Sequence, residues 1–132
     1  MKVVQVSGKR KRAVARARLI EGKGLIRINS LSLDSYGPEL ARALVSEPLI
    51  LAGDLAKEVD IAVNVRGGGW HSQAEAVRLV IARALVQYSG TKALKQKFLE
   101  YDRHLLVADT RRAESSKPND SKPRAARQKS YR

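Results

Sequence analysis

Two stretches of the chain alternate between apolar and polar side chains, which predicts half-buried β-strands at Arg12–Ile20 and Asp60–Arg66. Alanine and arginine also favour helices, so composition alone allows a helix in the first stretch. A helix would spread its arginines around the circumference, whereas a strand gathers them on one side, and we therefore predict a strand. The expected inward residues are Ala13, Ala15, Ala17 and Leu19 in the first strand and Ile61, Val63 and Val65 in the second.

Three shorter segments complete the predicted strands. Val3–Val6 is a candidate strand ahead of the first alternating stretch. Glu21–Gly24 is a turn by its glycines, and Leu25–Asn29 then forms the return strand of a hairpin. Leu105–Val107 is a candidate for a last short strand.

The remaining apolar positions recur at helical spacing. A first helix opens at Gly37–Glu39, where Pro38 takes the first helical position and Glu39 complements the helix dipole. We expect this helix to stop before Pro48, with a second short helix at Pro48–Leu55.

A longer helix is predicted after the glycine triplet Gly67–Gly69. Ser72 and Glu75 fit a capping box at its start, and Gly90 is placed to end it. Thr91 then caps a further helix. The apolar positions are Val77, Val80, Ile81, Ala84 and Tyr88 in the first of these helices and Leu94, Phe98 and Leu99 in the second.

Charge is distributed unevenly over the 132 residues, whose formal net charge is +13. Residues 1–28 carry net +8, residues 29–108 net 0 and residues 109–132 net +5. Such a surplus calls for a polyanionic partner, with nucleic acid the first candidate and an anionic membrane surface the second. The pattern predicts a globular domain at residues 1–108 and an extended basic tail at residues 109–132, too poor in apolar groups to fold without a partner.

Several functional classes find little support in the composition. The chain has no cysteine, which excludes disulfides and thiolate metal sites and suits a reducing cytosol. No apolar run approaches the roughly 18 residues of a membrane span, and no secretory signal is visible. His71 and His104 lack a nucleophile–base signature, and Asp54, Asp60 and Asp102 lack the spacing of a carboxylate pair or metal site. We expect no enzyme activity, no metal and no cofactor.

Six cations gather near the N-terminus without one acid among them: Lys9, Arg10, Lys11, Arg12, Arg16 and Arg18. An ordinary solvated surface mixes the two signs, so this cluster favours phosphate binding. We expect the five arginines and lysines from Arg10 to Arg18 to share one surface that faces RNA.

The triplet Gly67–Gly69, between a strand and a helix, has two interpretations. Free backbone N–H groups at a helix start suit a phosphate or the close approach of an RNA backbone. A tight turn with positive φ would require the same residues. The triplet is not a nucleotide-binding loop, because no Lys-Ser or Lys-Thr pair follows it. Trp70 either stacks on a base or covers the edge of the core.

A set of short motifs recurs in a recognisable order along nearly the whole chain. The motifs are Gly8–Lys11, Ala13–Arg16, Gly22–Gly24, Ile28–Asn29, Gly67–Gly69, Gln73–Ala74, Ile81–Leu85 and Ala126–Arg132. The set resembles the universal small-subunit ribosomal protein nine family, and the Ser-Tyr-Arg ending is similar to its archaeal and eukaryotic branch. Two places depart from that family: Ser72 stands where glycine is usual, and Glu114–Asp120 replaces a more basic segment.

The resemblance implies a two-layer α+β fold, a mostly antiparallel sheet packed with helices, with a left-handed βαβ crossover and an extended C-terminal tail. It implies a structural role in the head of the small subunit of the cytoplasmic ribosome. The implied partners are small-subunit rRNA, peptidyl-site tRNA and neighbouring head proteins, with no membrane and no small-molecule substrate.

Two groups of site residues follow from the charge pattern and the resemblance together. The residues expected to bind rRNA are Lys9, Arg10, Lys11, Arg12, Arg16, Arg18, Lys23, Gly67, Gly68, Gly69, Gln73, Arg111, Arg112 and Arg124. The residues expected to contact tRNA are Arg127, Gln128, Lys129, Ser130, Tyr131 and Arg132.

Three rival interpretations make different demands on the chain. A free-standing RNA-binding protein, such as the protein part of a tRNA-processing ribonuclease, would not need a long arm ending in Gln128–Arg132. A small-molecule phosphate enzyme would need a base or metal ligand near Gly67–Gly69. A basic DNA-compacting protein is disfavoured by the neutral, apolar-rich middle of the chain.

Overall fold

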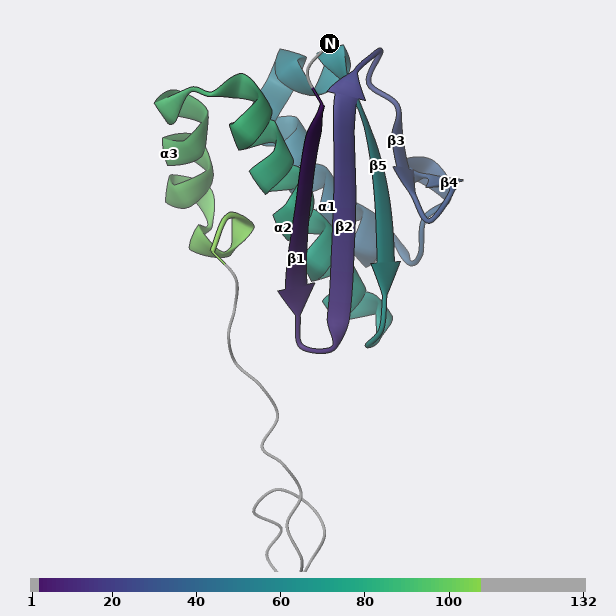
Figure 1. Cartoon of the computed structure of the whole chain (residues 1–132). Coiled ribbons are helices and arrows are strands. Elements are labelled where there is room, and N and C mark those ends of the chain that lie inside the picture. The colour runs from purple at the N-terminus through teal and green to yellow at the C-terminus, as the bar shows by residue number, and fades with distance from the viewer. Residues whose placement is uncertain (1–2, 108–132) are drawn as a thin grey trace, which may run out of the picture.

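A mixed five-stranded sheet carries helices on one face, as Figure 1 shows. The computed structural model describes residues 3–107, so the predictions for residues 109–132 lie outside the described part. The strands are β1 (Val4–Arg10), β2 (Ala13–Glu21), β3 (Ile26–Ile28), β4 (Leu31–Ser32) and β5 (Val59–Arg66). The helices are α1 (Glu39–Ala52), α2 (Trp70–Ser89) and α3 (Lys92–Tyr101), with short 3-10 helices η1 (Leu33–Ser35), η2 (Gly53–Glu58) and η3 (Arg103–Leu105).

The sheet order is β1-β2-β5-β3-β4. All neighbours are antiparallel except β3 and β5, which run parallel. Two parallel neighbours cannot be joined by a tight turn, and here α1 lies in the connection between them. The α+β prediction is therefore confirmed, with a mixed sheet and three α-helices in the described chain.

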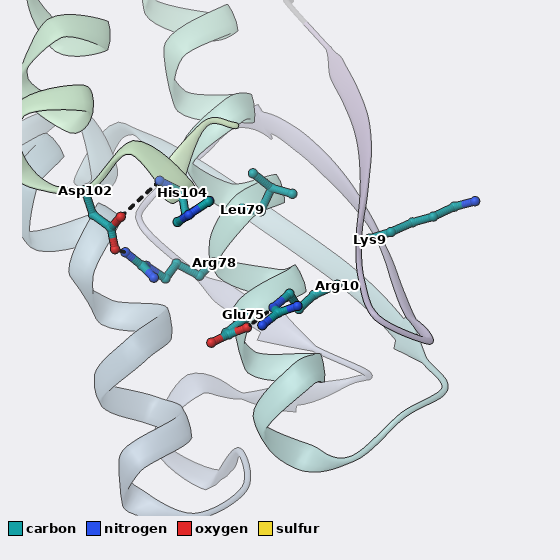
Figure 2. A pocket seen from close by; sticks show the side chains of 7 residues that line it. All are labelled: Lys9, Arg10, Glu75, Arg78, Leu79, Asp102 and His104. Carbon is teal, nitrogen blue, oxygen red and sulfur yellow. Dashed lines mark hydrogen bonds and ion pairs between the residues drawn. The ribbon is translucent and has the colours of Figure 1, made fainter. Parts of the chain in front are cut away.

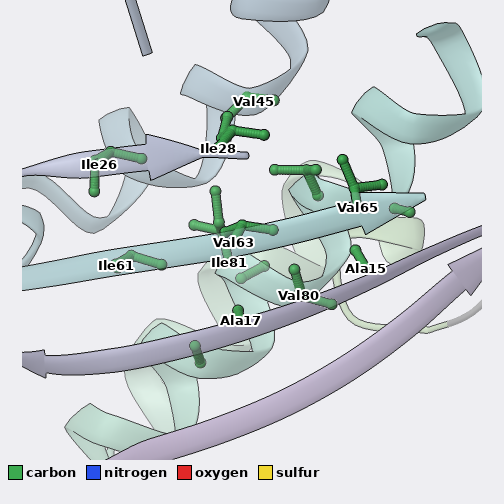
Figure 3. Close-up of a cluster of buried hydrophobic side chains, with 14 of the residues drawn as sticks. Ala15, Ala17, Ile26, Ile28, Val45, Ile61, Val63, Val65, Val80 and Ile81 are labelled. Atoms are coloured by element: carbon green, nitrogen blue, oxygen red, sulfur yellow. The ribbon is translucent and has the colours of Figure 1, made fainter. Parts of the chain in front are cut away.

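The two alternating strands pair with each other and supply the centre of the core. β2 and β5 are antiparallel, so that Ala17 lies opposite Val63 and Ala15 opposite Val65. All seven predicted inward residues of these strands are buried. All seven belong to one core cluster with Val80 and Ile81 of α2, and Figure 3 shows five of them there: Ala15, Ala17, Ile61, Val63 and Val65. The period of two in the sequence was thus sufficient to predict which face of each strand is covered.

The predicted hairpin from β2 through Glu21–Gly24 to the next strand is wrong. β2 pairs with β1 on one edge and β5 on the other, which leaves no edge for β3. The connection instead crosses the end of β5, where the Asp60 carboxylate accepts hydrogen bonds from the N–H groups of Lys23 and Leu25 at 3.0 and 2.9 Å. It is β1 and β2 that form a hairpin.

Pro48 does not end the first helix. α1 runs unbroken through it from Glu39 to Ala52, and the predicted second helix is replaced by η2. Proline lacks the N–H of an interior helical bond, which costs about 3 kcal/mol in an isolated helix. Pro48 is nevertheless buried on the same face as Ala41 and Val45, so packing of that face against the core holds the helix together.

The capping box predicted for α2 is also wrong. Gly69 is the N-cap, no side chain caps the helix, and Ser72 lies inside the first turn. Gly67 and Gly68, with φ of 84° and 67°, turn the chain so sharply that the helix starts at Trp70. The end of α2 is as predicted, because Gly90 takes the left-handed C-cap conformation with φ of 66°.

The C-terminal end of the described chain holds a turn instead of the strand predicted at Leu105–Val107. Asp102 accepts a hydrogen bond from the His104 N–H at 3.0 Å and starts η3. Leu105 is buried there, so its apolar side chain docks onto the helices without joining the sheet. In α3, Phe98 is buried as predicted, whereas Leu99 is exposed.

Candidate nucleic-acid interface

The face of the sheet opposite the helices is uncovered by any described element, and we call it the open sheet face (Figure 1). The residues between the buried positions of each strand point to this side, since successive side chains of a strand alternate. Strand pairing aligns these residues in rows that cross the sheet. The rows are Lys9–Val14–Arg66, Ser7–Arg16–Asn64 and Gln5–Arg18–Ala62–Arg27.

Cations dominate the open sheet face. Lys9, Arg16, Arg18, Arg27 and Arg66 all lie on it, and all five are exposed. They come from four strands that are consecutive in the sheet, β1, β2, β5 and β3. An array of this kind presents positive charge in two dimensions, with strands about 4.8 Å apart and outward residues about 7 Å apart along a strand.

Among residues 3–107, the single acid on this face is Asp60, at the end where β5 begins. Its carboxylate accepts the backbone N–H groups of Leu25 and Lys23, and these hydrogen bonds lower the pKa of Asp60 below its ordinary value. The carboxylate is therefore committed to holding the β2–β3 connection. It lies in the row of Ile20, beyond the rows that carry the cations.

Neutral polar groups lie between the cations and make the surface uneven. Two shallow hollows open onto the face, and both include Arg16 and Asn64 in their lining. Hydroxyl and amide groups of this kind contact the sugars and phosphates of nucleic acids alongside the charged groups. Besides Arg16 and Asn64, the residues that line the two hollows from the open side are Gln5, Ser7, Val14, Arg18, Ser30, Ala62 and Arg66.

Arg10 does not belong to this surface, which corrects the prediction of one shared face. In β1 the residues that face the helices are Val4, Val6, Gly8 and Arg10. Figure 2 shows the Arg10 side chain directed toward Glu75 of α2 while Lys9 projects to the other side. The Arg10 Nε lies 2.5 Å from a Glu75 carboxylate oxygen, and the Arg10 side chain is only 14% exposed. Arg10 therefore attaches the β1–β2 hairpin to α2.

Lys11 and Arg12 form the tip of the β1–β2 hairpin. Both are exposed, and Lys11 adopts a positive φ of 53°. They lie beside the Lys9 end of the open sheet face, because Arg10 pairs with Ala13 across the turn. Lys23 is exposed at the opposite end of that face, next to Asp60. The hairpin tip thus extends the basic surface beyond the sheet.

The glycine triplet forms a tight turn with positive φ at Gly67 and Gly68, which is one of the two interpretations allowed by the sequence. A Cβ on Gly67 would lie 2.4 Å from the Arg12 carbonyl oxygen, and one on Gly68 would lie 3.3 Å from the Ala13 nitrogen. These two glycines are therefore required by packing against the hairpin and by their positive φ. Gly69 has an ordinary φ of −91° and open space around it. Gln73 donates a hydrogen bond to the Gly67 carbonyl at 3.1 Å, which supports the loop.

The site contains cations that the sequence analysis did not select. Arg27 stands alone between two isoleucines, and Arg66 ends the second alternating strand. Each lies at an outward position of its strand, so the period-two pattern contained the signal. Only the pairing of β3 with β5, and of β5 with β2, brings both of them beside Arg16 and Arg18.

A second charged cluster lies on the helical side and has a structural role. Arg78 of α2 is 7% exposed, and its guanidinium lies 3.0 Å from Glu47 of α1 and 2.5 Å from Asp102 after α3. Burial alone would raise the pKa of Asp102, but the hydrogen bonds from Arg78 and the His104 N–H lower it below its ordinary value. Through Glu47 and Asp102 the cluster ties α1, α2 and η3 together, and Figure 2 shows Arg78 beside Asp102.

Residues 3–107 contain neither a group of three potential metal ligands nor a helix of the length and apolarity that a bilayer span needs. The predicted site residues Arg111, Arg112 and Arg124, and the segment Arg127–Arg132, lie outside the described part of the chain.

Comparison with known proteins gives a consistent result. Residues 8–132 match the family model described as ribosomal protein S9/S16. The chain is 48% identical, over 134 aligned positions that cover all of both chains, to small ribosomal subunit protein uS9 of Methanococcus maripaludis strain C5. The same protein of strain C7 shows the same identity and coverage.

Proposed function

The chain belongs to the ribosomal protein S9/S16 family, and on that premise we propose that its open sheet face binds small-subunit ribosomal RNA. Family membership makes the chain a structural component of the small ribosomal subunit, acting in translation on the cytoplasmic ribosome and not as an enzyme. Its further partners would be the other proteins and the RNA of that subunit.

The observation that carries the proposal is the charge of the open sheet face. Five exposed cations, Lys9, Arg16, Arg18, Arg27 and Arg66, share it with one acid that is bonded to backbone N–H groups at the margin. Cations that neutralise phosphates release condensed counterions, and this supplies much of the affinity for RNA. Arginine adds a planar fork of donors that matches phosphate oxygens.

The shape of the surface supports a broad RNA contact. The array spans several strands and continues into the hairpin tip at Lys11 and Arg12. One phosphate would need only a small concave site, whereas a two-dimensional array matches phosphates on successive nucleotides or on two strands. Contacts of this kind position a folded RNA without reading its sequence.

A salt titration tests the proposal with a matched control. Arg16→Ala combined with Arg18→Ala removes two charges from the open sheet face, and Lys92→Ala combined with Lys95→Ala removes two from exposed positions of α3. We expect the first pair to flatten the slope of log K against log[salt] for rRNA binding by about 0.7–0.9 per lost contact, and the second pair to leave it unchanged. Equal slopes for the two variants would mean that Arg16 and Arg18 make no phosphate contacts and that the open sheet face does not bind rRNA.

We further propose that residues 109–132 form a separate basic tail that contacts tRNA at the peptidyl site. The segment carries net +5, and its one large aromatic residue, Tyr131, is next to the C-terminus. Arg132 and Lys129 would contact phosphates, and Tyr131 would pack on a ribose or base. Phosphate contacts do not distinguish sequences, which suits a site that accepts every tRNA. The resemblance supports placing this tail, and the domain at residues 1–108, in the head of the subunit.

We also infer that the β3–α1–β5 crossover is left-handed. Its support is the arrangement in Figure 1, where the helices lie behind the sheet, β5 points downward and β3 lies to the right of β5. The chain leaves β3 downward, passes behind the sheet through α1 and returns in β5, to the left of β3. This path is a left-handed turn. Left-handed crossovers are rare, because about 98% of the connections between parallel strands of one sheet are right-handed.

A further inference from the structure

The outward side of α1 is apolar. Ile50 is 75% exposed and Leu40 is 55% exposed, and Ala43 between them is also exposed. Their spacing of three and seven residues places them along one line on the helix, which we call the α1 stripe, and the half-buried Glu47 lies on that line between Ala43 and Ile50. Buried residues such as Ala41 and Val45 occupy the opposite side, so the stripe is not part of the core.

α3 provides an internal comparison, because it is also a surface helix. Five of its exposed positions are charged or polar, namely Lys92, Lys95, Gln96, Lys97 and Glu100, and the other three are Ala93, Leu99 and Tyr101. This is the usual pattern for a helix that faces water. α1 departs from it in degree, because Ile50 is 75% and Leu40 55% exposed, whereas the exposed aliphatic Leu99 of α3 is 39% exposed. An exposed apolar patch of this kind marks a contact with another molecule.

The segment that contains α1 is acidic, although the chain as a whole is strongly basic. Residues 31–58 contain five acidic and two basic side chains, while the whole chain carries net +13. The two basic groups are partly engaged. Arg42 donates a hydrogen bond to the Gly37 carbonyl at 2.7 Å, and Lys57 lies 3.9 Å from Asp54. The five acids, which we call the acidic rim, are Asp34, Glu39, Glu47, Asp54 and Glu58, and of these Glu47 also pairs with Arg78 of α2 at 3.0 Å.

We propose that the α1 stripe docks a basic, apolar-bearing segment of a neighbouring protein of the small subunit. The inference rests on the proposed function, which places the chain in a particle of RNA and other proteins. RNA is disfavoured as the occupant, since like charges across an interface are repulsive. A basic protein surface complements the acidic rim, and its apolar side chains cover Leu40 and Ile50.

The chain's own tail is the other basic candidate, and its composition argues against it. Residues 109–132 match the acidic rim in charge but contain no large apolar side chain apart from Tyr131. They would leave most of the α1 stripe in water. The protein therefore has two functional sides: a basic sheet face for RNA and an acidic, apolar helix face for protein.

Photo-crosslinking in purified small subunits tests this assignment. The crosslinker p-benzoylphenylalanine replaces Ile50 in one variant and Asn64, an exposed residue of the open sheet face, in the other. We expect position 50 to give adducts that resist ribonuclease and contain a peptide of another protein rich in lysine and arginine. An adduct of position 50 with RNA or with residues 109–132, or the lack of any adduct, would overturn the proposal. Position 64 should give RNA adducts. The lack of RNA adducts at position 64 would count against the proposed RNA contact of the open sheet face and would leave the proposal for the α1 stripe unaffected.

A competition experiment measures the contribution of the α1 stripe to assembly. Ile50→Glu and Leu99→Glu introduce the same charge on exposed apolar positions of α1 and α3. Mixed with wild-type protein during subunit reconstitution, Ile50→Glu should be incorporated roughly fivefold to tenfold less well, as expected for losing an interface anchor. Leu99→Glu should compete equally, and both free variants should melt and bind rRNA like the wild type. Equal incorporation of Ile50→Glu would overturn the proposal.

Discussion

Replacing Gly67 by alanine should destabilise the folded chain by about 2–3 kcal/mol, mainly through the contact with the β1–β2 hairpin. Gly67 has φ of 84°, and a left-handed conformation costs an L-residue roughly 1–2 kcal/mol. The new Cβ would also lie 2.4 Å from the Arg12 carbonyl oxygen, so the hairpin or the loop must shift, at an overpacking cost of about 1–3 kcal/mol. Alanine recovers about 0.4–1 kcal/mol by restricting the unfolded chain, which leaves a net loss.

Urea unfolding followed by circular dichroism measures this loss, with Gly69→Ala as the control. Gly69 has φ of −91°, and a Cβ at this position would meet no other part of the fold within 4 Å. The same substitution there should change the free energy of unfolding by less than about 0.5 kcal/mol. If Gly67→Ala were as stable as Gly69→Ala, the structural role assigned to the loop would be refuted. Gly69→Ala also reports on RNA: lower rRNA affinity with intact folding would assign the open side of the loop to RNA contact.

The charged groups and the tail lead to three further predictions. Asp60→Asn should destabilise the chain at neutral pH. Because the pKa of Asp60 is lowered below 3.8 in the folded state, the difference in the free energy of unfolding between the variant and the wild type should shrink as pH falls below that value. Urea unfolding at a series of acidic pH values would measure this difference. Arg78→Met should cost about 1–3 kcal/mol in thermal or urea unfolding, since it leaves Glu47 and Asp102 partly buried without their cation, and an unchanged stability would contradict the role of the cluster. Deleting Ser130–Arg132 should leave subunit assembly intact and speed tRNA dissociation from the peptidyl site for all tRNAs alike; wild-type dissociation rates would count against the tail proposal.

Local pattern was sufficient for the buried faces of the two central strands and for the end of α2. The alternation in β2 and β5 predicted their buried residues, because the period of a strand is a property of the backbone. Gly90 predicted the end of α2, since a left-handed C-cap requires a residue without a Cβ penalty. The basic character of the N-terminal region also followed from local charge, although the geometry of its surface did not.

Several errors have one cause, which is that packing between distant segments outweighed a local signal. Pro48 favours a helix boundary, but burial of its face keeps α1 continuous. Arg10 belongs by composition to the basic cluster, yet strand alternation turns it toward Glu75, 65 positions away in the sequence. Glycines at residues 22–24 suggested a hairpin, whereas the Asp60 carboxylate holds that segment as a crossing to β3.

The family, the strand faces and the excess of positive charge could all be read from the order of residues, because each depends on residue identity and on spacing within a single segment. Which cations form a surface depended on the fold: Arg27 and Arg66 join Arg16 and Arg18 through the pairing of β5 with β2 and β3, a contact between segments more than 30 residues apart. The exposure of Ile50 on α1 depended on it as well. Strand order and helix packing are set by the free energy of the whole core, and no local window of sequence contains that sum.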